Sequence, residues 1–211
     1  MGAPPVGMLA IAGGKGGVGK TTTALCLADA YVRRRRRPLA VDADRGMPNC
    51  HLYAGTAGER GVADIAAGVP IDAAAEPAAA PPGVDVLAGG DADPETYLDA
   101  LPADRPVILD TAAAGAGADV GAALAAADAA VVVATPDRDA VRDGLKSAAL
   151  ARALGTPVVA CVVVATAGDV TGIERVVEAL TAPVPAARDP LTDVAVAVAH
   201  GRVAGVIGPN A

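Results

Sequence analysis

The chain has 211 residues, enough for one sizeable α/β domain and too few for two. Apolar residues make up 53% of it, as is typical of a parallel sheet buried on both faces, and they include no Phe and no Trp. The net charge of −7 and the scarcity of aromatic side chains argue against general nucleic-acid binding, which rests on phosphate neutralisation and base stacking.

The three cysteines, Cys26, Cys50 and Cys161, are far apart in the sequence and form no C-x-x-C pair. We therefore expect neither a disulfide nor a dedicated zinc or iron–sulfur site. The first residues carry no signal pattern and no apolar run reaches transmembrane length, so we expect a cytoplasmic protein.

The first predicted strand, residues 6–12, leads into a glycine-rich loop and then into a helical pattern over residues 19–32. From Gly14 to Thr21 the loop has the spacing G-x-x-x-x-G-K-[ST] of a phosphate-binding loop. Its glycines let backbone N–H groups approach an anion closely, and the helix points the positive end of its dipole at the same place. Lys20 is expected to reach the β- and γ-phosphates of a nucleotide, and the Thr21 hydroxyl to bind Mg²⁺. The alternative is a glycine-rich turn that binds no ligand. That alternative does not explain why all eight positions of the phosphate-binding pattern, from Gly14 to Thr21, are matched in this order.

Five consecutive arginines, Arg33–Arg37, end this helix and are followed by Pro38. Basic residues at a helix C-terminus interact favourably with the helix dipole, so one interpretation is a capped and solvated helix end. The other is contact with an anionic membrane surface or with nucleic acid. Five arginines exceed what capping alone needs, and both interpretations stay open.

A short apolar strand, residues 39–41, runs into two carboxylates, Asp42 and Asp44. Ligands bind at the carboxyl ends of the strands in open α/β sheets, so these side chains are expected beside the phosphate loop. A solvated acidic turn is the alternative. His51 follows without a second metal ligand and is interpreted as a surface histidine.

The middle of the chain has weaker patterns. It predicts a short helix over residues 59–68, an irregular Ala/Pro-rich loop over 72–83, a strand over 84–87 and a helix over 94–101. An apolar strand over residues 105–111 then places Asp110 at its carboxyl end. This is the arrangement of a Walker B aspartate, which binds Mg²⁺ through water.

The last third predicts strands over residues 131–135 and 157–164, and helices over residues 135–154, 172–180 and 191–200. Pro136 and Asp137 are favourable at the start of the first of these helices. His200 has no evident partner and is interpreted as structural. The alternation of strands and helices predicts one domain over residues 1–211, a doubly wound, mainly parallel α/β sheet with helices on both faces, as in P-loop NTPases.

The loop K-G-G-V-G-K-T-T contains an additional lysine, Lys15, and resembles the deviant phosphate-binding loop of the MinD/ParA family of dimeric ATPases. The resemblance implies that Lys15 crosses a dimer interface and contacts the partner's nucleotide, and that Lys15, Lys20 and Asp44 are catalytic. A solvated lysine on an exposed loop is the alternative for Lys15. The nucleotide-binding residues implied in this loop are Gly14, Lys15, Gly16, Gly17, Val18, Gly19, Lys20, Thr21 and Thr22.

The segment V-D-A-D-R-G-M-P-N resembles the family's first switch. By position, Asp44 is expected to orient or deprotonate the attacking water and to help hold Mg²⁺. Asp42 is expected to support the Mg²⁺ shell, and Asn49 to lie near the γ-phosphate. Together with Thr21 and Asp110, the two carboxylates make up the implied magnesium site.

Two features of the family are altered. The second switch, usually D-[TS]-P-x-G, is D-T-A-A-A-G here, so Ala112 replaces the proline and Ala114 stands where the glycine is expected. In the family that glycine's N–H senses the γ-phosphate, so we expect weaker nucleotide-driven switching but little effect on nucleotide binding. The asparagine that contacts the adenine amino group in many members is also missing after Val164. Base recognition is therefore expected to rest on backbone groups or on Val184 and Pro185.

The resemblance to the MinD/ParA family implies an ATPase that uses ATP and Mg²⁺, forms a homodimer when ATP is bound, and is reset by hydrolysis. Its implied role is the spatial organisation of an unidentified protein partner. One alternative is a metal-cluster or cofactor assembly ATPase of the same superfamily; the missing C-x-x-C counts against it, although Cys50 could lie at a dimer axis. Another is a non-hydrolysing nucleotide-binding adaptor, which the altered second switch allows. No membrane-targeting helix like that of MinD is expected, so membrane contact would use Arg33–Arg37, and no specific nucleic-acid binding is expected.

Overall fold

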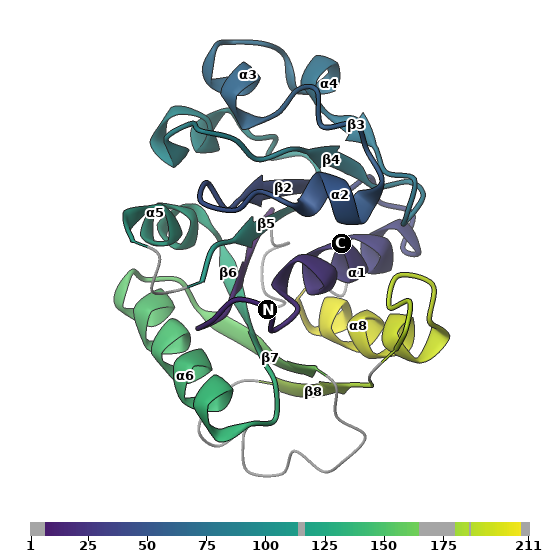
Figure 1. Ribbon diagram of the computed structural model, residues 1–211, viewed down its shortest axis with the longest axis vertical. Helices are drawn as coiled ribbons and strands as arrows, with labels where there is room; N and C mark the ends of the chain where they lie inside the picture. The colour runs from purple at the N-terminus through teal and green to yellow at the C-terminus, as the bar shows by residue number, and fades with distance from the viewer. Residues whose placement is uncertain (1–6, 114–116, 165–179, 186, 208–211) are drawn as a thin grey trace.

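The computed structural model describes residues 7–113, 117–164, 180–185 and 187–207, and in these residues eight strands form one sheet (Figure 1). The strand order across the sheet is β3-β4-β2-β5-β1-β6-β7-β8. Neighbouring strands are parallel, except that β3 is antiparallel to β4. The strands are β1 (Met8–Ala12), β2 (Leu39–Ala43), β3 (Glu76–Pro77), β4 (Asp85–Leu87), β5 (Val107–Thr111), β6 (Ala129–Ala134), β7 (Val158–Val164) and β8 (Leu180–Val184).

The described helices are α1 (Lys20–Val32), α2 (Cys50–Ala54), α3 (Val62–Ala66), α4 (Ile71–Ala74), α5 (Ala118–Ala126), α6 (Arg138–Ala153) and α8 (Val194–Ile207), with short 3₁₀ turns η1 (Pro94–Thr96) and η2 (Leu98–Ala100). They cover both faces of the sheet. α1 and α8 lie side by side on one face with α2 beside α1, and α5 and α6 lie on the other face (Figure 1). The predicted doubly wound, mainly parallel fold is thereby confirmed.

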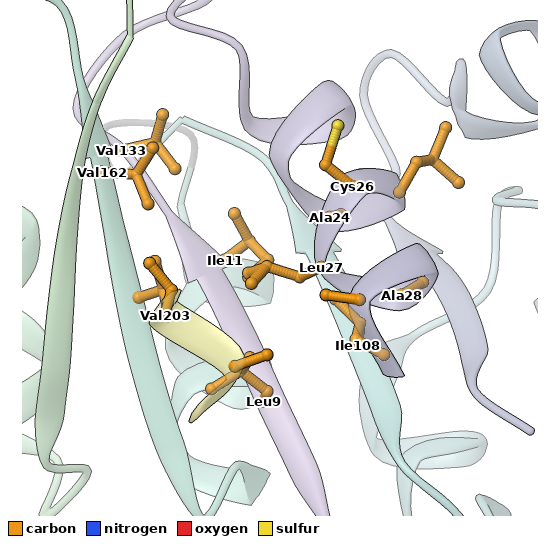
Figure 2. Close-up of a cluster of buried hydrophobic side chains, with 14 of the residues drawn as sticks. Leu9, Ile11, Ala24, Cys26, Leu27, Ala28, Ile108, Val133, Val162 and Val203 are labelled. Carbon is orange, nitrogen blue, oxygen red and sulfur yellow. The ribbon is translucent and has the colours of Figure 1, made fainter. Parts of the chain in front are cut away.

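The core follows from the alternation of side chains along the central strand β1. Leu9 and Ile11 lie in one buried cluster with residues of α1 and with Val203 of α8 (Figure 2). Ala10 and Ala12 point to the opposite layer, which contains residues of α5 and α6. Successive residues of a strand face opposite sides of the sheet, so a strand covered on both sides must be apolar throughout. The sheet therefore holds the phosphate loop, which follows β1, on a rigid support.

The strand order places the carboxyl ends of β1, β2 and β5 next to one another. β5 lies between β1 and β2, and the register pairs Ile11 and Asp42 with Asp110 from either side. The chain then continues through β6, β7 and β8 on the far side of β1. Such a reversal of strand order leaves a crevice outside the carboxyl ends of the strands, where open α/β sheets bind ligands.

The structure differs from the predicted elements in the middle of the chain. The Ala/Pro-rich segment, predicted as irregular, contains most of α4 and the edge strand β3, while residues 94–101 form the turns η1 and η2 instead of one helix. α2 and α5 were not predicted. Six of the nine residues of α5 are alanine or glycine, so its sequence contrasts little between a buried and an exposed face.

The C-terminal part also differs. Leu180, predicted to end a helix, begins strand β8, and the rest of that predicted helix lies outside the described residues. β8 contains a proline, Pro183, which is compatible with its place at the edge of the sheet. The last helix runs from Val194 to Ile207 instead of residues 191–200. None of the described helices is long and apolar enough to cross a bilayer.

Candidate active site

The phosphate loop connects the carboxyl end of β1 to the first turn of α1. Gly17 and Gly19 adopt left-handed φ angles of 76° and 94°, which residues with a Cβ rarely adopt. Gly19 is also the N-cap of α1, and no side chain caps the helix through a hydrogen bond. The first N–H groups of α1 are therefore left to an external acceptor, which is the usual anion site at a helix N-terminus.

A pocket of about 220 Å³ lies over this loop and collects most of the predicted site residues. On one side it is lined by Gly16, Gly17 and the stretch from Gly19 to Thr22, and on the other by residues of the first switch. The residues contributed from outside the loop are Asp44, Met47, Asn49, Tyr53 and Thr111. The loop and the first switch, separated in sequence, thus share one cavity.

Lys20 lies within the curve of the loop. Its side chain is only 8% exposed, and its Nζ donates to the backbone carbonyl of Lys15 at 3.3 Å. A buried ammonium group that is held by one neutral acceptor keeps donors available for an anion. Its position beside the N-terminus of α1 agrees with the predicted contact to the phosphates.

Thr21 and Asn49 line the pocket, and Asp110 lies next to Thr21 without being one of the lining residues. The Thr21 hydroxyl donates to Asn49 Oδ1 at 3.1 Å, which joins the first turn of α1 to the first switch. Asp110, at the carboxyl end of β5, is buried, and its Oδ1 has no hydrogen-bond partner among the described residues. Burial raises the pKa of Asp110 to about 7, against the opposing effects of the nearby Thr21 hydroxyl and the Lys20 ammonium.

These oxygens fit a magnesium site of the kind found with nucleotides. Mg²⁺ at such sites is held by one or two protein oxygens and completes its shell with phosphates and water. Thr21 Oγ1 and the unpartnered carboxylate oxygen of Asp110 supply such ligands. No group of three or more His, Cys, Asp or Glu side chains suited to a metal occurs in the described part of the chain.

Asp42 holds the first switch in place. Its Oδ2 accepts from the N–H groups of Asn49 and Cys50 at 2.8 and 2.9 Å, and its Oδ1 accepts from that of Asp44 at 3.0 Å. Burial raises the pKa of Asp42, and these three hydrogen bonds oppose the rise. The structure therefore gives Asp42 a positioning role, and the predicted support of the Mg²⁺ shell stays a prediction.

Asp44 closes a turn and borders the pocket. Its Oδ1 accepts from the N–H groups of Gly46 and Met47 at 3.1 and 3.0 Å, which is the geometry of an Asx turn. Its Oδ2 takes part in no hydrogen bond within the described residues and remains available as an acceptor. The predicted handling of water by Asp44 is compatible with this placement and is untested.

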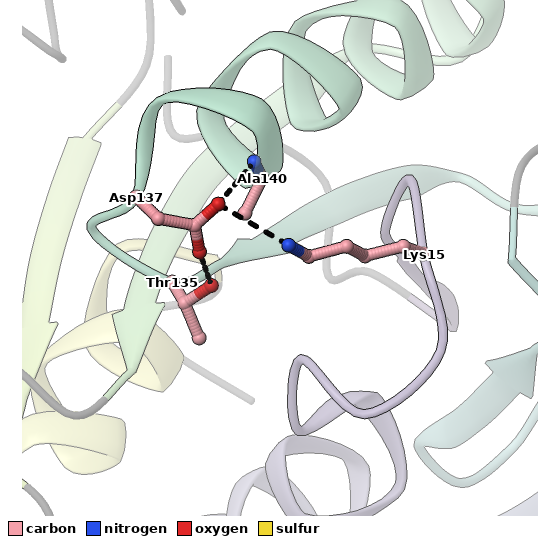
Figure 3. Close-up of polar contacts among 4 residues, drawn as sticks. All are labelled: Lys15, Thr135, Asp137 and Ala140. Carbon is pink, nitrogen blue, oxygen red and sulfur yellow. Dashed lines mark hydrogen bonds and ion pairs between the residues drawn. The ribbon is translucent and has the colours of Figure 1, made fainter.

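Lys15 contacts its own subunit through Asp137 (Figure 3). Its Nζ lies 3.2 Å from Asp137 Oδ1, and the two side chains are 43% and 51% exposed. Asp137 is the N-cap of α6, where the same carboxylate accepts from the Thr135 hydroxyl and from the Ala140 N–H. Hydrogen bonds from Thr135, Ala140 and Lys15 lower the pKa of Asp137 to about 2, so this carboxylate is charged at neutral pH. The sequence had placed Asp137 in the first helical turn and gave no signal of this pairing.

The second switch is described only in part. The Thr111 hydroxyl donates to the carbonyl of Ile11 at 2.8 Å and so joins the ends of β5 and β1. Ala112 is buried. Ala114 and Gly115 lie outside the described residues, so the consequence of the replaced glycine stays a prediction.

A second pocket, of about 180 Å³, adjoins the first. Gly19 and Thr22 line both pockets. The other lining residues are Thr23, Val164, Val184, Pro185, Ala187, Pro190, Val196 and His200. Pro185, predicted as a base contact, lines this pocket, and the base contact itself stays a prediction. His200, interpreted as structural, lines the same pocket.

The arginine run lies at the opposite end of α1, about 20 Å from the phosphate loop for a helix of 13 residues. Arg33 pairs with Asp29 at 2.7 Å, Arg34 donates to the carbonyl of Gly201 at 3.0 Å, and Arg37 lies 3.7 Å from Asp85. Part of the run is thus used within the protein. Both the helix-end interpretation and membrane contact therefore stay predictions.

The cysteines and His51 take no visible part in the site. Cys26, Cys50 and Cys161 are free and buried, and burial raises the pKa of each thiol. Protonated buried thiols are poor metal ligands, and a fully buried Cys50 is not available at the surface of this conformation.

Comparison with known proteins agrees with this geometry. The nucleotide-binding domain shared by CobQ, CobB, MinD and ParA matches residues 9–201, so this is a P-loop nucleotide-binding protein. The chain belongs to the MinD/ParA family of P-loop ATPases. The cell division ATPase MinD of Pyrococcus furiosus has the same fold, with a TM-score of 0.83 at 23% identity over 95% of this chain and 97% of that one.

Two further relatives were compared. MinD of Pyrococcus horikoshii, solved with Mg-ADP, gives a TM-score of 0.74 at 20% identity over 97% of this chain and 89% of its own. The antiactivator FleN of Pseudomonas aeruginosa is 42% identical over 64 residues. That match spans 30% of this chain and only 23% of FleN, so it carries no conclusion about the activity of the whole protein.

Proposed function

We propose that this protein is a MinD/ParA-like ATPase that dimerises when ATP is bound and is reset by Mg²⁺-dependent hydrolysis. The observation that carries the proposal is the single pocket shared by Lys20, Thr21, Asn49 and Asp44. Its use in the cell would be the spatial organisation of a partner protein. The assignment of family members as cell division ATPases supports that last step only by analogy.

The chemistry follows from the placement of these groups. Lys20 and the free N–H groups of α1 bind and neutralise the phosphates of ATP, which leaves the γ-phosphorus open to attack by water. Thr21 and Asp110 would hold Mg²⁺, which neutralises charge that develops on the phosphate oxygens. Asp44 Oδ2 would accept a hydrogen bond from the attacking water and orient it. Asp42 keeps Asp44 and Asn49 in position through its three backbone hydrogen bonds.

Exposed apolar side chains beside the pocket support a dimer that covers it. The described chain has four large apolar residues that are strongly exposed, and three of them, Met47, Leu52 and Tyr53, belong to the first switch and α2. Met47 and Tyr53 also line the phosphate pocket. Apolar groups gathered at a site are typical of a surface that another protein covers. A second copy would bury them together with the nucleotide.

The experiment is single-turnover hydrolysis of ATP, with gel filtration in parallel, for wild type and Asp44→Ala. We expect Asp44→Ala to bind ATP, to hydrolyse it much more slowly and to accumulate as an ATP-bound dimer, because Asp44 acts mainly in the transition state. EDTA should abolish turnover of the wild type. Wild-type rates in the variant would remove Asp44 from the mechanism.

A second candidate is a nucleotide-binding adaptor that hydrolyses ATP slowly or not at all. It is favoured by the sequence D-T-A-A-A-G, in which the glycine that senses the γ-phosphate is replaced. An ATP-bound dimer of the wild type that shows no hydrolysis in a single turnover would support it. Metal bound to anaerobically purified protein would instead favour an assembly ATPase, against which the buried thiols count.

A further inference from the structure

A cavity of about 400 Å³ lies at the edge of the sheet opposite the phosphate loop. It is found at the amino ends of β2 and β5, between the arginine run, α4 and the segment that leads into β5. Its volume is within the range of small-molecule binding sites. We call it the arginine cavity, because six of its seven lining residues are charged and four of these are arginines: Arg35, Arg36, Arg37, Arg105, Asp72 and Asp104.

The arginine cavity has more positive than negative groups, although the chain as a whole has a net charge of −7. Asp85 is shared between two guanidinium groups: Arg105 donates to its Oδ2 at 2.6 Å, and Arg37 lies 3.7 Å from the same oxygen. Arg35 and Arg36 make no ion pair or side-chain hydrogen bond within the described residues. Their guanidinium groups are therefore available to an anion that enters the cavity.

The backbone at Arg35 is unfavourable for an arginine. Its φ is 60°, and among the described residues it is the one non-glycine residue with a left-handed φ. The N–H of Arg36 donates to the carbonyl of Tyr31 at 3.1 Å, and that of Arg35 donates to the carbonyl of Val32 at 2.8 Å. This is the Schellman motif, whose left-handed position is usually a glycine. Residues kept in such a strained conformation gather at functional sites, which points to a use for this side chain.

The mixture of charges limits the kind of ligand. Guanidinium groups bind phosphate oxygens through paired N–H donors. Asp72 and Asp104 line the same cavity, and a carboxylate repels a bare phosphate or a continuous anionic surface. A ligand that carries hydroxyl groups beside its phosphate would supply donors to these carboxylates.

We propose that the arginine cavity binds a small phosphorylated polyol, such as a sugar phosphate. Its phosphate is held by Arg35 and Arg36, and its hydroxyl groups donate to the two carboxylates that line the cavity. The site lies beyond the other end of α1, about 20 Å from the phosphate loop, and does not rest on the proposed ATPase function.

The first test is a calorimetric titration of the full chain with fructose 1,6-bisphosphate, with Mg-ADP present in excess to fill the phosphate loop. Wild type should bind the bisphosphate and not fructose. Arg35→Gln should weaken binding about 10-fold or more, because a charged hydrogen bond is lost. Arg33→Gln is the matched control, since Arg33 belongs to the same run but pairs with Asp29 and does not line the cavity. No binding to wild type, or equal affinities in the two variants, overturns the proposal.

Arg35→Gly separates the loss of binding from a loss of folding. Glycine adopts a left-handed φ at little cost, so we expect the Tm to rise by about 2–4 °C while binding weakens as in Arg35→Gln. A more stable variant that has lost the ligand would show that Arg35 is kept for binding. Unchanged affinity in Arg35→Gly, or a Tm below that of wild type, contradicts the proposal.

The same phosphate chemistry could come from a lipid headgroup, and sedimentation with vesicles distinguishes the two sources. The vesicles contain phosphatidylcholine with phosphatidic acid, whose headgroup is a phosphate monoester. We expect no sedimentation that depends on Arg35. Sedimentation that is lost in Arg35→Gln and kept in Arg33→Gln, without binding of fructose 1,6-bisphosphate, would assign these arginines to a membrane and overturn the soluble ligand.

Discussion

Gly14→Ala tests whether the phosphate loop is packed against α6, as the structure indicates. A Cβ on Gly14 would lie 2.7 Å from the Cα atom of Asp143 and 2.5 Å from its carbonyl carbon, closer than real Cβ contacts. These are backbone atoms of a regular helix, so the loop or the helix must move. Overpacking of this kind costs about 1–3 kcal/mol. For a chain of 211 residues this lowers the Tm by about 2–12 °C.

Gly16→Ala is the matched control two positions along the same loop. No atom lies within 4 Å of the Cβ that would be added at Gly16, and its φ is not in the left-handed region. An exposed substitution of this kind changes stability by about 0.5 kcal/mol at most, or about 2 °C in Tm. Thermal unfolding of the nucleotide-free variants measures the difference. Equal Tm values for Gly14→Ala and Gly16→Ala would refute the packing of the loop on α6.

Three further outcomes are expected. Lys20→Ala should weaken Mg-ATP binding about 10- to 150-fold in a titration, because charged hydrogen bonds of about 1.5–3 kcal/mol are lost; unchanged affinity would remove this lysine from the phosphate site. Lys15→Ala should bind ATP as a monomer but should neither dimerise nor hydrolyse ATP. Mixing it with Asp44→Ala should restore up to half of the wild-type activity per dimer, because one of the two sites in the heterodimer then contains both Asp44 and the partner's lysine. Heterodimers without recovery would show that Lys15 acts within its own subunit or not at all. Burial lowers the pKa of His200 in the folded protein, so below pH 6.5 the unfolded chain binds a proton at His200 more readily than the folded protein does. The free energy of unfolding, measured in urea, should therefore fall more between pH 7.5 and 5.5 in wild type than in His200→Phe.

Local patterns predicted the parts of the site that are close in sequence. The spacing from Gly14 to Thr21 and the carboxylates at the ends of β2 and β5 were enough, because parallel strands bring their carboxyl ends to one edge of the sheet. The fold class followed from the alternation of apolar strands and helical patterns. Each of these patterns is local in the sequence, and the geometry of the parallel sheet then brings the distant segments together.

Contacts between distant segments were not predictable in this way. Lys15 and Asp137 are 122 residues apart, and nothing near either residue indicates the other. His200 stands in an apolar helix, where a lone histidine has the pattern of a core residue. Its place in the pocket depends on how α8 packs beside α1, which only the structure shows. The same limit explains why α5 and β8 were not predicted. α5 consists mainly of small residues and β8 contains a proline, so neither sequence shows the usual pattern of its element.

The hydrogen bonds distinguish a firmly held part of the site from the loosely held side chain of Lys15. Within one chain, Thr21 is bonded to Asn49, and Asp42 binds three backbone N–H groups of the first switch, so the surfaces for phosphate and Mg²⁺ are preformed. The Lys15 side chain, in contrast, has one ion pair within the described residues, the exposed pair with Asp137, and exposed pairs are weak and screened by salt. A lysine that leaves its partner at little cost is free to contact a second nucleotide. This arrangement agrees with the proposed ATPase, in which a single subunit would bind ATP and hydrolysis would begin when two subunits meet.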